Sequence, residues 1–153
     1  MDKIRKVVVS ACLLGVNCRY DGKTKACEAV IRKVAEYRNA GVEVVEVCPE
    51  ELGGLPTPRD PQDLRGGDGH DVLAGRATVQ RTTDDSDVTG AFLRGVERSF
   101  AKAAGAQVAI LKARSPSCGI GQTNIDGRVA DGDGVFAALC RQEGLHLICD
   151  EDL

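Results

Sequence analysis

The chain has 153 residues, of which 42% are apolar and 28% are charged, and its formal net charge is −3. This length suits one domain spanning residues 1–153, and the apolar fraction excludes a disordered or collagen-like chain. Because the net charge is negative and the aromatic residues are only two Tyr and three Phe, the composition argues against nucleic acid as a partner.

The hydrophobic pattern alternates between strands and helices. In chain order it predicts a strand over 6–11, a helix over 25–39, strands over 42–47 and 77–83, a helix from a cap at Asp87 to about residue 104, a strand over 107–112, a helix over 135–142 capped by Asp133, and a strand over 145–149. The Gly-rich segments 53–75 and 114–131 are predicted to be long loops. This order predicts an α/β protein with a small three-layer Rossmann- or flavodoxin-like fold and a mostly parallel sheet of four or five strands.

The seven cysteines are the most informative feature of the composition. No signal-peptide pattern follows the N-terminus, and the longest apolar run, over 7–14, is too short to cross a bilayer. We therefore expect a cytoplasmic protein without a membrane partner, in which many cysteines indicate metal binding or thiol chemistry. Cys27 and Cys140 fall within the helical patterns and are predicted to be small core residues.

Three cysteines follow three predicted strands. Cys12 and Cys48 come directly after the first two main strands, and Cys118 lies six residues after the third. Because ligands of open α/β sheets bind beyond the carboxyl ends of the strands, we expect these thiols to converge. The chain has no CxxC pair of the kind that holds structural zinc, whereas separated cysteines suit an iron–sulfur cluster. Cys18 and Cys149 remain candidates for a fourth ligand.

Four short motifs carry a resemblance to a known family. They are SACLLG at 10–15, CRYDG at 18–22, CPE at 48–50 followed by GGLPTPR at 53–59, and SPSCG at 115–119. In this order and spacing the set resembles the thiouracil desulfurase family over nearly the whole chain. The resemblance implies a [4Fe-4S] cluster held by Cys12, Cys48 and Cys118, whose open iron takes sulfur from a thiolated nucleobase.

The resemblance also implies the catalytic side chains. Glu50 of the CPE motif, with Ser115 or Ser117 of the SPSCG motif, would act on a small thiolated pyrimidine and convert C=S to C=O without electron transfer. A carboxylate two residues after a cluster ligand could activate water or protonate a ring nitrogen. The alternatives are an ion pair between Glu50 and Arg59 and a purely structural role for the two serines in a turn beside Pro116.

Several other polar residues are weaker candidates. Arg19, Asp21 and Arg59 are expected near the pocket, and a patch of Arg59, Arg65 and Arg114 would favour RNA over a free base. His70 and His146 have no partner at ligand spacing and are expected to be structural.

Two other functions fit parts of the pattern. A small phosphatase would use Cys12 and Arg19, but six residues separate them where a phosphate loop has five. A non-catalytic module in which four cysteines close a metal site is the stronger alternative, and it makes Glu50 dispensable.

Overall fold

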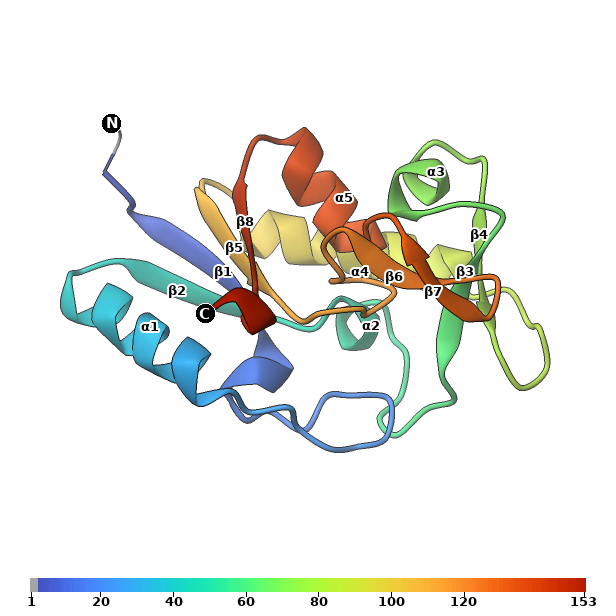
Figure 1. The fold of residues 1–153 in the computed structure, drawn as a ribbon, viewed down its shortest axis with the longest axis horizontal. Helices are drawn as coiled ribbons and strands as arrows, with labels where there is room; N and C mark the ends of the chain where they lie inside the picture. The colour runs from blue at the N-terminus through green and yellow to red at the C-terminus, as the bar shows by residue number, and fades with distance from the viewer. Residues whose placement is uncertain (1–2) are drawn as a thin grey trace.

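The structure is a computed structural model that describes residues 3–153. A parallel sheet in the order β2-β1-β5-β8 forms the left half of the molecule in Figure 1. Its strands are β1 (Lys6–Ser10), β2 (Glu43–Val47), β5 (Val108–Leu111) and β8 (His146–Cys149). The sheet confirms the predicted α/β class and its parallel strands.

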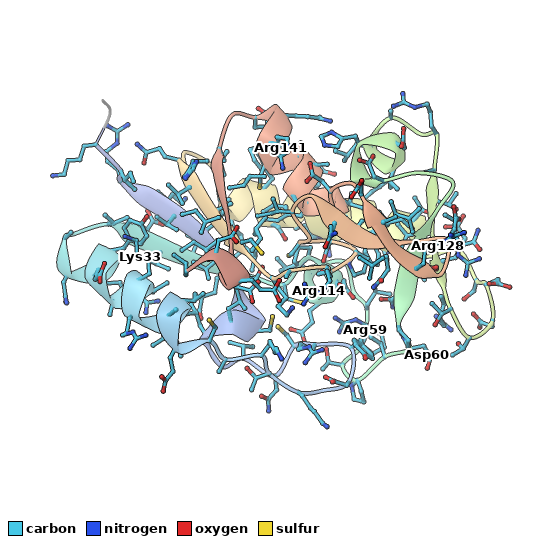
Figure 2. All side chains as sticks on the ribbon, in the orientation of Figure 1. Lys33, Arg59, Asp60, Arg114, Arg128 and Arg141 are labelled. Atoms are coloured by element: carbon cyan, nitrogen blue, oxygen red, sulfur yellow. The ribbon has the colours of Figure 1, made fainter. Side chains whose placement is uncertain are left out.

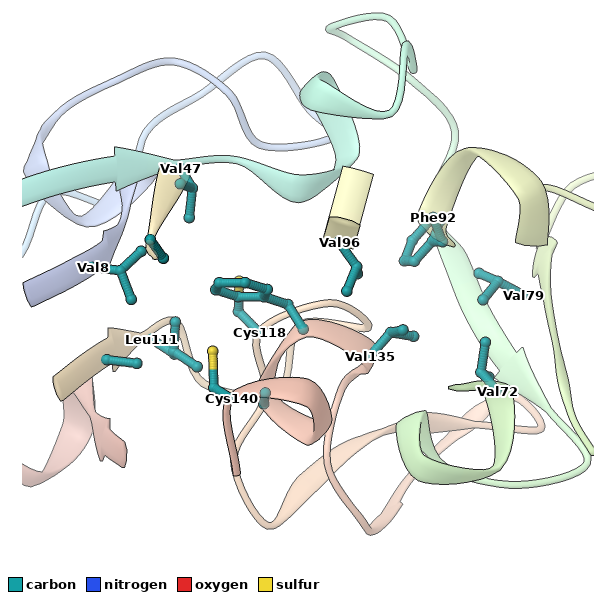
Figure 3. Packing of buried hydrophobic residues seen from close by; sticks show 14 of the residues in the cluster. Val8, Val47, Val72, Val79, Phe92, Val96, Leu111, Cys118, Val135 and Cys140 are labelled. Atoms are coloured by element: carbon teal, nitrogen blue, oxygen red, sulfur yellow. The ribbon is translucent and has the colours of Figure 1, made fainter. Parts of the chain in front are cut away.

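Helices cover both faces of this sheet. Helix α1 (Glu28–Asn39) packs on one face, where its Val30 and Val34 are buried against Val7 and Val9 of β1. Helices α4 (Thr89–Lys102) and α5 (Val135–Gln142) pack on the other face with Val8 (Figure 3). The alternation of buried side chains along β1 follows from the period of two in a strand, and it gives the sheet two apolar layers.

A second sheet lies beyond the first, in the order β4-β3-β6-β7. Its strands are β3 (Gln62–Arg65), β4 (Thr78–Arg81), β6 (Gln122–Ile125) and β7 (Arg128–Asp131). The prediction of long loops over 53–75 and 114–131 is therefore wrong. Strand β4 confirms the strand predicted over 77–83. Strands β3, β6 and β7 have four residues each and carry polar side chains between glycines, so their periodicity is too weak to detect.

Four short helices lie next to the ends of strands. They are η1 (Ala11–Leu14) after β1, α2 (Pro49–Leu52) after β2, α3 (Gly69–Leu73) before β4, and η2 (Asp150–Asp152) after β8. Within residues 3–153, no helix is long and apolar enough to cross a membrane.

The two predicted helix caps have different outcomes. Asp87 lies one residue before Val88, the N-cap of α4, and its carboxylate accepts a hydrogen bond from the backbone N–H of Thr89, the first residue of the helix, at 2.8 Å. Asp133 does not cap α5, which follows Gly134. Its buried carboxylate instead accepts hydrogen bonds from Arg141, His70 and the backbone of Gly121, and so joins α5, α3 and the second sheet. His70 therefore has a structural role, as expected.

The Asp133 network makes stability depend on pH. Burial alone would raise the pKa of Asp133, but the hydrogen bonds from Arg141, Gly121 and His70 outweigh it and lower the pKa from 3.8 to about 2. Because the pKa is lower in the folded protein, the stabilisation is complete above about 4 and is lost as the pH falls toward 2.

We predict that Asp133→Asn lowers the free energy of unfolding at pH 7 by about 1.5–3 kcal/mol, the range for hydrogen bonds to a charged group. The deficit relative to wild type should shrink as the pH falls below 4. Urea unfolding across this pH range measures both effects. The matched control is Asp131→Asn, because this carboxylate is exposed, and it should change stability by less than about 0.5 kcal/mol. Equal stability of Asp133→Asn and wild type at pH 7 would contradict the prediction.

Candidate functional site

A cavity of about 410 Å³ opens at the carboxyl ends of β1, β2 and β5. Four cysteines line it: Cys12, Cys18, Cys48 and Cys118. Gln62 of β3 and Asn124 of β6 also line it, so the second sheet contributes to its wall. All seven cysteines of the chain, each within the described residues, are free thiols.

The parallel sheet brings Cys12, Cys48 and Cys118 together. Cys12 lies in η1 directly after β1, and Cys48 precedes α2 directly after β2. Cys118 lies in the loop after β5, which pairs with β1. Cys12 and Cys118 are 7% and 4% exposed, and Cys48 is half-buried. The structure therefore gathers the three predicted ligands around one cavity, as their positions after the strands imply.

Cys18 is the fourth thiol of the cavity, and it comes from the loop between η1 and α1. It is 2% exposed, and its carbonyl oxygen accepts a hydrogen bond from the Cys48 Sγ at 3.6 Å. The sulfur atoms of Cys18 and Cys48 and a carboxylate oxygen of Glu51 all lie within 4.8 Å of one another. Of the two candidates for a fourth ligand, Cys18 is thus the one beside the other thiols.

The remaining cysteines lie elsewhere. Cys149 ends β8, and its Sγ donates to Asp150 Oδ1 at 3.7 Å; among the described residues it does not line the cavity. Cys140 is fully buried in α5, as expected for a core residue (Figure 3). Cys27 precedes α1 as its N-cap and is half-buried, so the prediction that it lies inside the helix is wrong.

The SPSCG loop is held by the start of α5. The carbonyl oxygens of Pro116 and Ser117 accept hydrogen bonds from the backbone N–H groups of Val135 and Phe136 at 2.9 and 2.8 Å. A Cβ on Gly134 would lie 2.6 Å from the Ser117 carbonyl carbon, so only glycine permits this approach. These contacts fix the backbone on which Cys118 is carried.

The two serines of this loop have different partners. Ser117 is 2% exposed, and its Oγ donates to Glu50 Oε2 at 3.0 Å. Ser115 Oγ accepts hydrogen bonds from the backbone N–H groups of Ser117 and Cys118 and lies 3.1 Å from Ser117 Oγ. Ser117 therefore contacts the carboxylate, whereas Ser115 shapes the loop.

Glu50 is buried and ion-paired at the cavity wall. It is 7% exposed, and its Oε1 accepts a hydrogen bond from Arg59 Nε at 3.0 Å. Arg59 also donates to the carbonyl oxygen of Cys18 at 3.0 Å. The ion pair considered as an alternative to catalysis is thus present, and the same carboxylate lines the cavity beside the thiols. The pair holds Glu50 in one place without removing it from the site.

Three of the four thiols that line the cavity have a raised pKa. Hydrogen bonding to Cys12, together with burial, raises the pKa of Cys18 to about 12. Burial, with the neighbouring Cys48 and Glu50, raises the pKa of Cys118 to about 12. The pKa of Cys48 is raised further, first by its contact with Cys18 and then by burial. A metal or cluster must therefore displace protons from these groups.

The residues that line the cavity are more basic than the chain as a whole. Glu50 is its one acidic lining residue within 3–153, and the basic ones are Arg19, Lys25, Arg59, Lys112 and Arg114. Figure 2 labels Arg59 and Arg114 among these side chains.

Some predicted pocket residues are confirmed and others are not. Arg19 and Arg59 line the cavity, whereas Asp21 accepts a hydrogen bond from the backbone of Lys23 outside it. Arg65 pairs with Asp63 and Asp85 and does not contribute to the patch expected with Arg59 and Arg114.

Sequence reasoning missed several other cavity residues. Lys112 directly follows β5, and this strand-end position could have identified it. Gln62 and Asn124 lie in segments that were predicted as loops, and no sequence signal points to them.

Close packing of α2 on α4 positions Cys48 and Glu50. A Cβ on Gly95 of α4 would lie 1.7 Å from the Pro49 carbonyl oxygen, and one on Gly53 would lie 2.0 Å from the Ala91 carbonyl oxygen. Arg98 adds a hydrogen bond of 2.7 Å to the carbonyl oxygen of Leu52. The two glycines therefore set how closely the CPE segment approaches the core.

Known proteins share the sequence pattern and the fold of this chain. A family model described as 2-thiouracil desulfurase matches residues 7–152. The chain belongs to the 2-thiouracil desulfurase family. It is 41% identical to the uncharacterized protein YbbK of Bacillus subtilis (strain 168) over 152 aligned positions, which cover 96% of this chain and 97% of that protein. Its structure is also similar to that of the [4Fe-4S]-dependent thiouracil desulfidase TudS, with a TM-score of 0.79, 37% sequence identity, and coverage of 97% of this chain and 93% of that one.

The close contact between α2 and α4 at Gly95 predicts that a larger residue there lowers both stability and metal loading. Gly95→Ala forces α2 away from α4, so we expect an unfolding free energy lower by about 1–3 kcal/mol, as for overpacking, and a loss of metal loading at Cys48. Thermal unfolding and metal content on the same sample measure the two effects. The matched control is Gly90→Ala in the same helix, where the added Cβ meets only the end of Arg94 at 3.6 Å. That variant should be as stable as wild type or up to about 1 kcal/mol more stable.

Proposed function

We propose that this protein is a [4Fe-4S]-dependent thiouracil desulfidase, which converts the C=S group of a 2-thiouracil-like pyrimidine to C=O and releases sulfide. The observation that carries the proposal is the cavity in which the thiols of Cys12, Cys48 and Cys118 surround one space beside the Glu50 carboxylate. The named activity of the 37% identical structural relative supports it.

The residues of the cavity suit an iron–sulfur cluster. Thiolates are the ligands that such clusters use. Cys12, Cys48 and Cys118 follow three adjacent strands, and the loop that carries Cys118 is held by hydrogen bonds to the start of α5. Cys18, in contrast, forms its compact group with Cys48 and Glu51. We therefore assign the cluster to the first three, an arrangement that leaves one iron without a protein ligand.

The bound cluster would supply an iron Lewis acid that matches a soft thiocarbonyl sulfur. The protein's part is to activate water and move protons. Glu50, held in place by Arg59 Nε at 3.0 Å, accepts a proton from the water that attacks the C=S carbon. The hydroxyl of Ser117 donates to Glu50 Oε2 and aims the carboxylate at the cavity. Water supplies the new carbonyl oxygen, and the sulfur leaves as hydrogen sulfide, so the reaction is balanced without an electron donor.

A non-catalytic module with a closed four-cysteine site is the second candidate. The observation that favours it is the position of Cys18 in the same cavity as the other three thiols. The two functions differ in what Cys18 does: a closed site loses metal in Cys18→Ala, whereas the desulfidase retains its cluster.

The ligand assignment predicts which cysteines are required for iron. Cys12→Ala, Cys48→Ala and Cys118→Ala should each prevent cluster assembly, because each removes one of three anchors. Cys140→Ala should keep the iron content of wild type, although its thiol is as fully buried as that of Cys118. Anaerobic reconstitution followed by iron, sulfide and absorbance measurements tests the set. Full iron loading of Cys118→Ala, or loss of iron in Cys149→Ala, would contradict the assignment.

The catalytic assignment predicts a separation of activity from cluster content. Glu50→Gln keeps the shape of the side chain but cannot accept a proton, and general acid–base catalysis contributes about 10²–10⁴-fold. We expect a cluster-loaded variant that releases sulfide from 2-thiouracil at least about 100-fold more slowly. The measurement is anaerobic sulfide release together with iron content on the same sample.

Glu46→Gln is the control, because Glu46 is an exposed carboxylate on β2, two residues before Cys48. It should have wild-type activity. Wild-type turnover by Glu50→Gln would exclude this residue as the base, and loss of iron from it would show that Glu50 supports the cluster instead.

A further inference from the structure

Cys18, Cys48 and Glu51 form a group of ligating atoms that the desulfidase assignment does not use as a unit. One atom from each, two sulfurs and a carboxylate oxygen, lies within 4.8 Å of the other two. Cys118 does not belong to this group of described residues, and Glu51 does not line the cavity. The group therefore overlaps the proposed cluster site only at Cys48.

The backbone holds these three residues together. Cys48 and Glu51 are three positions apart, from the N-cap into the first turn of α2, so their side chains lie on the same side of that turn. The Cys18 backbone is fixed by two donors to its carbonyl oxygen, Cys48 Sγ and Arg59 Nη2. Thr57 donates to Glu51 Oε2, which leaves Oε1 available.

The donor set selects the kind of ion. Two thiols with one carboxylate favour a thiophilic divalent cation over Mg²⁺ or Ca²⁺, which prefer oxygen ligands. Glu51 is exposed while Cys18 is buried, so the group extends from the cavity wall to solvent. Tetrahedral coordination needs a fourth ligand, which water supplies at the exposed side.

We infer that the cluster-free protein binds one zinc-type cation at Cys18, Cys48 and Glu51. Binding displaces the two thiol protons to solvent and involves no oxidation or reduction. The cation and the cluster exclude each other, because both need Cys48. This mutual exclusion is the part of the inference that rests on the proposed function. The site thus gives the cluster-free protein an alternative metal-bound state that blocks cluster assembly.

Direct metal titration tests the site. The full chain, reduced and freed of iron under anaerobic conditions, is titrated with Co²⁺, whose thiolate charge-transfer and tetrahedral absorption bands report on its ligands, and then with Zn²⁺ in competition. We expect one ion per chain. Substituting a residue that only hydrogen-bonds to a metal ligand typically lowers metal affinity by about 10–100-fold. Removal of a ligand itself should cost no less, so we expect Cys18→Ala to lower the affinity for Co²⁺ at least about 100-fold and Glu51→Gln at least about 10-fold.

Two control variants locate the ion. Cys118→Ala should bind Co²⁺ as wild type does while failing to assemble the cluster. Cys149→Ala removes another half-buried thiol beside carboxylates and should also bind normally. Thermal unfolding of each variant checks that it is folded. If Cys18→Ala is unfolded, the Co²⁺ affinity of Glu51→Gln, a substitution at an exposed position, decides the test.

Competition with the cluster provides a second readout. Wild type preloaded with one equivalent of Zn²⁺ and then freed of excess metal should assemble little cluster, whereas Glu51→Gln treated in the same way should assemble more. The inference is overturned if wild type binds no Co²⁺, if Cys18→Ala binds as tightly as wild type, or if Cys118→Ala weakens binding as much as Cys18→Ala does. None of these results concerns sulfide release, so they are separate from a failure of the desulfidase proposal.

Discussion

Parallel pairing of β2, β1 and β5 is the constraint on which the site depends. Parallel strands end at the same edge of a sheet, so the residues that follow them meet even when they are distant in sequence. Here Cys12 and Cys48 lie two residues and one residue after the paired strands β1 and β2, and the β1–β5 pairing brings the loop of Cys118 to the same edge. A slip of one residue in a strand would turn these positions toward the opposite face, so the valines that bury both faces of β1 also secure the site.

Two close backbone contacts fix the positions of the segments that carry Cys48 and Cys118. Gly95 lets α2 approach α4, and Gly134 lets the SPSCG loop approach the start of α5. Both contacts lie on the face covered by α4 and α5, where the larger apolar cluster packs. The thiols of Cys48 and Cys118 are therefore positioned by helices whose other sides are in the core. This arrangement holds the ligands in place before any metal arrives, although their protons must still be displaced.

The charges of the cavity differ from those of the chain. Glu50 is enclosed by Arg59 and Ser117, which satisfy both of its oxygens in a buried setting. Such a carboxylate keeps a fixed position, because removing either partner leaves a buried polar group unsatisfied. Around it the lining is basic despite the net charge of −3. Net charge consequently describes the surface as a whole and says little about what the cavity attracts.

The sequence by itself determined the parallel sheet, the three cysteines after its strands, and Glu50 beside one of them. Periodicity is a local property, and strand ends are readable from it. The tertiary structure alone decided that Ser117 contacts Glu50, that Arg59 bridges Glu50 and Cys18, and that Cys18 approaches Glu51. It alone revealed β3, β6 and β7 and their assembly with the predicted strand β4 into a second sheet, through partners such as Leu64 and Ile125 that are far apart along the chain. Short polar strands have no recognisable period, because long-range pairing rather than local pattern stabilises them.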